Sequence, residues 1–247
     1  MKFGIDLGHG VNPDRGAVGN IAEETIINAV GSKVISKLKA LGHSVVELRP
    51  ASANSVQDSL QQRYNKADYY NVDMCISIHA NAGGGVGTEV FTYNAKEVPQ
   101  ARAVLNNICS LGFRNRGIKD GSGLAMVKRP SATAMLIEVC FIDTQSDVDL
   151  YHSIGSEKIA NAIVEGLTGQ KVYDNNEKCY VVTNYLPPAY EGYDGVDISY
   201  VLSYFSGVKC YVRGNEKGVW IETAYITKEK AEELKNTLGS WFYEIKK

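Results

Sequence analysis

The sequence predicts an α/β protein, in which a mixed, mostly parallel sheet is flanked by helices and is followed by a small α+β unit. Apolar strand-like runs alternate with helical periodicity through the first two thirds of the chain, as in parallel or mixed sheets. Some runs are apolar at nearly every position, which is typical of central strands that are covered on both faces. After about residue 170 the composition changes, which indicates a second unit.

The predicted strands of the first unit are the apolar runs. They cover residues 2–7, 43–48, 72–79, 88–93 and 134–140.

The predicted helices lie between these runs. In the first, apolar residues recur at helical spacing from Glu24 to Leu41, and Gly42 ends it. Further helices are expected over 55–67 and 98–113, with a last one, continuous or broken, over 146–166.

The second unit follows a polar linker. We expect a first domain over 1–170, a linker over 171–178 and a second domain over 179–247. Strands at 179–183, 208–212, 219–223 and 241–245 combine with helices at 194–205 and from Thr227 onward into the order β-α-β-β-α-β, a ferredoxin-like module. This domain has no histidine and no clear catalytic constellation, so we expect it to bind a ligand and not to catalyse a reaction. Its many tyrosines and tryptophans could stack on sugar rings, but for any single one packing in the core or an interface is the preferred interpretation.

Composition excludes some classes of function. The 247 residues are 44% hydrophobic and 22% charged with a net charge of −2, so no global basic field argues for nucleic acid. Because no apolar run reaches about 18 residues, we expect no membrane span. Gly4 and Asp6 interrupt the start of the chain, and we therefore expect synthesis in the cytoplasm without a signal peptide.

Four residues form the candidate active site. His9 and His79 each follow a strand-like run, Glu138 interrupts an apolar run, and Glu24 begins the first long helix. The carboxyl ends of parallel strands meet at one edge of a sheet, so these side chains could converge. Two histidines and a carboxylate are a familiar ligand set for a hydrolytic zinc, and a second carboxylate could move protons.

Each residue also has a purely structural interpretation. A histidine after a strand can be a loop residue, and Glu138 could belong to a buried salt bridge. Glu24 could simply favour the helix start, and the adjacent Glu23 competes with it for any site role.

The segments around these residues resemble a known family. DLGHG (6–10), ETIIN (24–28), SIHANA (77–82) and LIEVCFI (136–142) look like the four blocks of the zinc-dependent N-acetylmuramoyl-L-alanine amidases of the amidase-3 type. The resemblance implies that His9, Glu24 and His79 ligate zinc and that Glu138 is the catalytic glutamate. Glu24 is preferred to Glu23 because the family places an asparagine four residues after its ligand, which matches Asn28. The family's Arg-x-x-x-Ala-Asn block appears as RYNKAD (63–68), with Asp68 in place of the asparagine.

The resemblance also implies a substrate. It suggests a peptidoglycan hydrolase that cleaves the amide between N-acetylmuramic acid and L-alanine, with a zinc peptidase of the stem peptide or a non-catalytic wall-binding protein as alternatives. The second domain resembles the SPOR-like peptidoglycan-binding domains in its order of elements. The combination looks like a phage endolysin of a Gram-positive, clostridial host. Such a protein would bind peptidoglycan through both domains. It would reach the cell wall after holin action or lysis.

Overall fold

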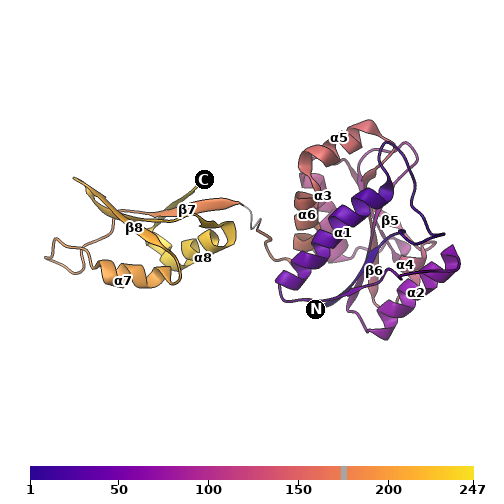
Figure 1. Ribbon diagram of the computed structural model, residues 1–247, viewed down its shortest axis with the longest axis horizontal. Helices are drawn as coiled ribbons and strands as arrows, with labels where there is room; N and C mark the ends of the chain where they lie inside the picture. Colours follow the sequence, from indigo (N-terminus) through magenta and orange to yellow (C-terminus); the bar gives the residue numbers. More distant parts are fainter. Residues whose placement is uncertain (174–176) are drawn as a thin grey trace. The chain divides into compact units, whose positions relative to one another are not determined.

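The computed structural model describes residues 1–173 and 177–247. The chain divides into two compact units, Met1–Val172 and Tyr173–Lys247 (Figure 1). The linker expected over 171–178 includes residues 174–176, which lie outside the described residues. Each unit is therefore considered by itself.

The first unit is built on a six-stranded sheet in the order β2-β1-β3-β6-β4-β5. Its strands are β1 (Lys2–Leu7), β2 (Ser44–Glu47), β3 (Met74–Asn81), β4 (Thr88–Thr92), β5 (Asn115–Asp120) and β6 (Thr133–Phe141). All neighbouring strands are parallel except β4 and β6, which are antiparallel. The predicted mixed and mostly parallel sheet is confirmed.

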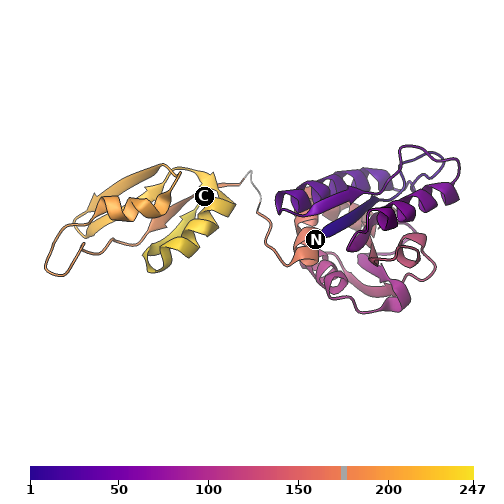
Figure 2. The same ribbon diagram turned by 90° about the horizontal axis from the view of Figure 1, so that it is seen from below.

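Helices cover both faces of this sheet (Figures 1 and 2). They are α1 (Glu23–Ala40), α2 (Val56–Tyr69), α3 (Pro99–Ser110), α4 (Ala125–Lys128), α5 (Gln145–Ile154) and α6 (Ser156–Thr168). Helices α1, α3 and α6 pack on one face, and α2 and α4 on the other. The helix expected over 146–166 is broken at Gly155, whose φ of 80° is incompatible with a continuous helix.

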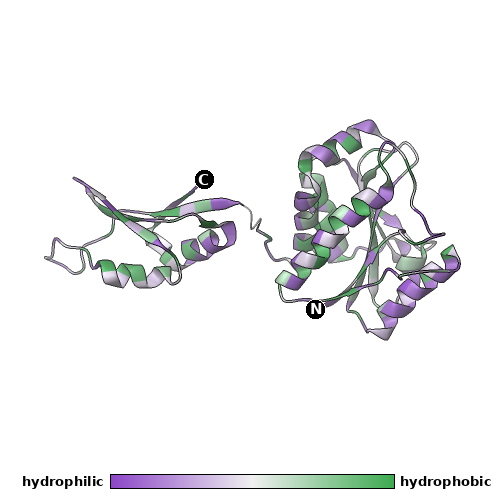
Figure 3. Cartoon of the chain, viewed as in Figure 1, coloured by the Kyte–Doolittle hydropathy of each residue, from purple (hydrophilic) through white to green (hydrophobic). Residues whose placement is uncertain are grey.

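Successive side chains of β3 point alternately to the two faces of the sheet. Met74, Ile76 and Ile78 face the larger core under α1, α3 and α6, whereas Cys75 faces the smaller core under α2 and α4. Burying each large apolar side chain stabilises the fold by about 1.5–3 kcal/mol. His79 has the same parity as Cys75, so it emerges on the α2 side, near the end of β3 where burial becomes incomplete. The helices of this unit carry hydrophobic and hydrophilic residues in alternation along their length (Figure 3).

Strand β5 was not expected from the sequence. Its residues, Asn115 to Asp120, are mostly polar and include Gly117 at a φ of 90°. Because β5 is the last strand of the sheet and pairs only with β4, it needs no continuous apolar surface. It therefore lacks the hydrophobic pattern by which the central strands are predicted.

The second unit is a separate antiparallel sheet with two helices. Its elements are β7 (Lys178–Thr183), α7 (Ile198–Leu202), β8 (Cys210–Asn215), β9 (Gly218–Thr223), β10 (Ile226–Thr227), α8 (Lys228–Leu238) and β11 (Phe242–Lys246). Strand β7 pairs with β11, β9 and the short β10, and β9 pairs with β8. The helix expected over 194–205 is shorter, because it starts at Ile198 and ends in a 3-10 turn at 203–205. Within residues 1–173 and 177–247, no helix has the length and apolar character that crossing a bilayer requires.

Candidate metal centre

The candidate site lies where β1, β3 and β6 approach their carboxyl ends. His79 of β3 and Glu138 of β6 are register partners, so their side chains are neighbours on the α2 face of the sheet. His9 lies two residues beyond the end of β1. The N-terminus of α1 supplies the remaining acidic residues.

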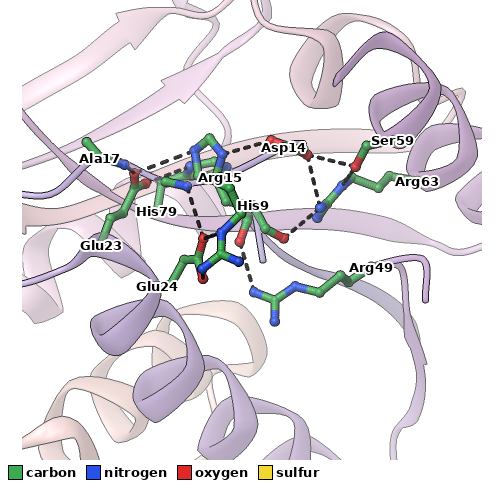
Figure 4. A network of polar contacts seen from close by, with 12 residues as sticks. His9, Asp14, Arg15, Ala17, Glu23, Glu24, Arg49, Ser59, Arg63 and His79 are labelled. Atoms are coloured by element: carbon green, nitrogen blue, oxygen red, sulfur yellow. Dashed lines mark hydrogen bonds and ion pairs between the residues drawn. The ribbon is translucent and has the colours of Figure 1, made fainter. Parts of the chain in front are cut away.

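Three side chains gather into a possible metal site. Ligand atoms of His9, Glu23 and His79 lie within 4.8 Å of one another (Figure 4). Nε2 of His9 is 3.5 Å from one carboxylate oxygen of Glu23, and Nδ1 of His79 is 3.1 Å from the other. Ligands held about 2.0–2.1 Å from a tetrahedral zinc lie roughly 3.3 Å apart, so the donor set and its spacing fit this ion.

The expectation for Glu24 needs correction, because Glu23 is the residue that faces the histidines. Consecutive residues of a helix point about 100° apart, so only one of the two can face the ring nitrogens. Glu24 instead accepts hydrogen bonds from Nε and Nη2 of Arg15, at 2.7 and 2.9 Å, and from the Gly16 backbone N–H.

Asn28, which favoured Glu24 in the sequence, has a different partner. Its Oδ1 accepts a hydrogen bond from Nη1 of Arg49 at 2.8 Å. Arg49 in turn donates to the carbonyls of Leu7 and Gly8. Asn28 therefore helps to hold the segment that leads to His9 and does not enter the candidate metal site.

Asp14 orients the His9 ring. Nδ1 of His9 is 2.9 Å from Oδ1 of Asp14, which leaves Nε2 directed at Glu23. His9 has a positive φ of 53°, an uncommon backbone conformation for a residue with a side chain. Burial raises the pKa of Asp14, but hydrogen bonds from Ser59 and His9 and the charge of Arg63 outweigh it, so the pKa is lowered and the carboxylate stays ionised.

Arg63 ties the start of the site to helix α2 (Figure 4). Its guanidinium is only 1% exposed and donates to Oδ1 of Asp6 at 2.6 Å, to Oδ2 of Asp14 at 3.2 Å and to the carbonyl of His9 at 2.7 Å. Charge-assisted bonds of this kind fix geometry, and removing one partner would leave a buried charge unpaired. The unusual backbone at His9 is thus held by a rigid, satisfied network.

Gly8 allows the two histidines to approach each other. A Cβ at this position would lie 2.3 Å from the His79 ring, too close for any real contact. The absence of a side chain lets the rings of His9 and His79 meet edge to face, with centroids 4.9 Å apart.

The charges of His79 and Glu23 balance each other. Burial lowers the pKa of His79, but its hydrogen bond to Glu23 and the nearby Glu138 raise the pKa more, so the net shift is upward. Burial raises the pKa of Glu23, but the interactions with His79 and His9 lower it further. The pair therefore favours an imidazolium and a carboxylate, the arrangement that a cation would replace.

Glu138 stands next to this group in a different environment. Burial raises its pKa to about 8, and the charges of Glu23 and Glu89 add to the effect while His79 opposes it. Its Oε2 atom is shielded from solvent and has no hydrogen-bond partner among the described residues. A carboxyl group of this kind can hold and release a proton near neutral pH.

Comparison with known proteins identifies the family. A family model for N-acetylmuramoyl-L-alanine amidase matches residues 4–169, more than half of the 247 residues. The chain belongs to the N-acetylmuramoyl-L-alanine amidase family.

The chain is also similar to individual proteins, one of which is named as an amidase. The chain is 33% identical to the N-acetylmuramoyl-L-alanine amidase LytC of Bacillus subtilis over 172 residues. This match covers 66% of this chain and 34% of LytC. The chain is 30% identical to an uncharacterized protein of Clostridium perfringens over 71% of this chain and 54% of that protein. The chain thus spans about a third to a half of the length of these curated relatives.

A solved structure shares the fold of the amidase unit. The catalytic domain of the CD27L endolysin, which targets Clostridia difficile, superposes with a TM-score of 0.63 at 25% identity. The match covers 70% of this chain and 99% of that domain.

The supporting roles of Asp14 and Arg63 were not predicted from the sequence. Asp14 lies in a polar loop, and nothing in the local pattern distinguishes it from a solvated acid. Arg63 matched a family block, but its spacing alone did not show that it contacts the His9 segment. Asp14 reaches the His9 segment from a loop and Arg63 reaches it from α2, so both contacts depend on tertiary packing.

Proposed function

We propose that this chain is a zinc-dependent N-acetylmuramoyl-L-alanine amidase that hydrolyses the amide between N-acetylmuramic acid and L-alanine in peptidoglycan. The observation that carries the proposal is the convergence of His9, Glu23 and His79 beside Glu138, in a chain of the amidase family. The endolysin likeness supports action on the bacterial cell wall.

His9, Glu23 and His79 would hold the zinc ion, with Nε2 of His9 and Nδ1 of His79 facing the Glu23 carboxylate. When bound, zinc supplies Lewis acidity, which activates water as a nucleophile and polarises the amide carbonyl. Asp14 and Arg63 hold His9 in place, so that the ligand nitrogen is already oriented before the ion arrives.

Glu138 would carry the proton of the reaction. Its carboxylate takes a proton from the attacking water and returns it to the departing amine of L-alanine. Glu138 is the register partner of His79, and this position beside the candidate metal centre suits a group that takes up and returns a proton there.

For the second unit we propose a ferredoxin-like, SPOR-like domain that binds the cell wall. The antiparallel order β11-β7-β9-β8, with α7 and α8 packed on one core, supports this topology. A groove of about 350 Å³ on this unit is lined by Tyr185, Trp220 and Tyr243 together with charged residues, which suits a polar ligand with flat faces. Together with the likeness to an endolysin domain, this supports a role as an endolysin of a Gram-positive host.

The proposed reaction is tested by digesting purified Gram-positive cell walls and identifying the bond cleaved by mass spectrometry. An amidase releases stem peptides with a free L-alanine amine and leaves glycans with unsubstituted muramic acid; a chelator should stop the release and zinc should restore it. Peptide fragments that remain attached to muramic acid would indicate the peptidase alternative. Binding without any release would indicate a non-catalytic protein.

Binding by the second unit is tested in the full chain. Trp220→Ala and Tyr243→Ala should reduce sedimentation with cell walls, while hydrolysis of a soluble muramoyl peptide stays unchanged. Tyr225→Ala is the matched control, since Tyr225 is 62% exposed but does not line the groove. Equal sedimentation of all three variants would contradict a binding role for this groove.

A further inference from the structure

A row of polar side chains extends from the candidate metal centre across the sheet. His79 on β3 pairs with Glu138 on β6, and Glu138 pairs with Glu89 on β4. Residues paired in this way point to the same face. Arg116 on the edge strand β5 continues the row, because its Nε donates to Oε2 of Glu89 at 2.8 Å.

Arg116 is held firmly although it is partly exposed. Glu89 is only 4% exposed, and its other oxygen accepts a hydrogen bond from Asn81 at 2.9 Å. The guanidinium carbon of Arg116 lies 4.8 Å from the centre of the Phe141 ring. Phe141 is itself fixed against Gly85, where a Cβ would lie 2.3 Å from the ring.

The terminal nitrogens of this guanidinium are free to bind a ligand. Within residues 1–173 and 177–247, Nε makes the one hydrogen bond of the Arg116 side chain, which leaves both terminal nitrogens available. The side chain is 31% exposed. A planar guanidinium that is held at Nε and stacked on an aromatic ring presents two parallel N–H donors, the geometry that recognises a carboxylate.

We propose that Arg116 binds a carboxylate of the stem peptide; this rests on the proposed amidase function. The carboxylate is the α-carboxylate of the residue that follows L-alanine, which is free when that residue is a glutamate joined to the rest of the peptide through its side-chain carboxyl group. The carboxyl group of muramic acid is consumed in the amide to be cleaved, so the nearest anion must lie on the peptide side. An extended peptide places its second residue about 7 Å from the first nitrogen. Arg116 lies two strands from Glu138, at about 4.8 Å per strand, and its guanidinium turns back toward Phe141 on the strand of Glu138.

The test compares two soluble substrates that differ only in this group. N-acetylmuramoyl-L-alanyl-D-glutamate carries a free α-carboxylate, and N-acetylmuramoyl-L-alanyl-D-isoglutamine carries an amide there. The native chain should hydrolyse the acid with a kcat/KM roughly 10- to 100-fold above that for the amide. Arg116→Gln should remove this preference by lowering kcat/KM for the acid alone.

Two variants separate recognition from folding. Arg116→Gln leaves the buried Glu89 without its cationic partner, so the double variant Glu89→Gln with Arg116→Gln removes both charges together. It should also lose the preference, measured as the ratio of kcat/KM for the acid to kcat/KM for the amide, while keeping its zinc content. Arg102→Gln is the matched control, since Arg102 forms an exposed pair with Glu97 in the same unit; it should retain the preference.

The outcomes are distinct. Equal hydrolysis of both substrates by the native chain, or an equal loss on both in the variants, would overturn the role of Arg116 and leave the amidase function standing. If the native chain hydrolysed neither substrate and released no peptide from cell walls, the proposed function itself would fail, and this inference with it.

Discussion

His9 and Asp14 form a contact that defines the candidate metal centre, because a distance of 2.9 Å between Nδ1 and Oδ1 fixes which ring nitrogen faces Glu23. The carboxylate in turn accepts from Ser59 and Arg63 and is itself held in place. A ligand oriented in this way loses little freedom when an ion binds.

Asp14→Ala should weaken zinc binding by about 10- to 100-fold, because the His9 ring would no longer be oriented and the Arg63 charge would lose one partner. Competition with a chromogenic chelator measures this affinity. Asp149→Ala, an exposed acid of α5, is the control and should bind zinc like the parent. Unchanged affinity in Asp14→Ala would refute the orienting role.

Gly8→Ala should also lose zinc, since its methyl group would occupy the position of the His79 ring. Gly123→Ala is the matched control, because a Cβ there meets nothing within 4 Å and the backbone is not at positive φ. Metal analysis of both purified variants checks the prediction. A zinc content in Gly8→Ala equal to that of Gly123→Ala would show that the close approach is not needed.

Neighbouring glutamates give a direct test of the ligand set. Glu23→Ala should lose zinc, whereas Glu24→Ala should keep about one ion per chain. The Glu24 variant loses an ion pair with Arg15, worth at most about 1 kcal/mol, and the hydrogen bond from the Gly16 N–H. Inductively coupled plasma mass spectrometry of the two variants decides. The reverse pattern would restore Glu24 as the ligand.

The shielded carboxyl of Glu138 should make the stability of the zinc-free protein depend on pH. Its folded pKa of about 8 lies above the unfolded value near 4.5, so its contribution is fully present below about pH 4.5 and is lost as the pH rises through 8. Glu138→Gln should therefore be more stable than the parent by about 1–3 kcal/mol near pH 8. Urea unfolding at pH 5 and pH 8 measures the difference, and an equal gap at both values would argue against the raised pKa.

The central strands were predictable because they are buried on both faces. Most residues of β1, β3 and β6 are buried, and the runs at β3 and β6 are mostly apolar, so His79 and Glu138 stand out against them. The polar edge strand β5 has no such pattern, so Arg116 could not be placed beside Glu89 and Phe141 from the sequence.

Glu23 and Glu24 show a second limit of sequence reasoning. Both are acids in the first turn of α1, and a resemblance in spacing pointed to Glu24 through Asn28. The choice depends on the rotation of α1 about its axis, which is set by packing of Ile26, Ile27 and Val30 in the core. Asn28 has its own partner in Arg49, so its position does not indicate which glutamate faces the histidines.

Glu138→Gln tests the central claim most directly when bond cleavage and zinc content are measured on the same preparation. The side chain keeps its shape but cannot carry the proton, so the variant should bind about one zinc per chain and release stem peptides from cell walls at least about 100-fold more slowly than the parent. A variant that holds zinc and releases L-alanine-terminated peptides at the parental rate would contradict the proposed mechanism.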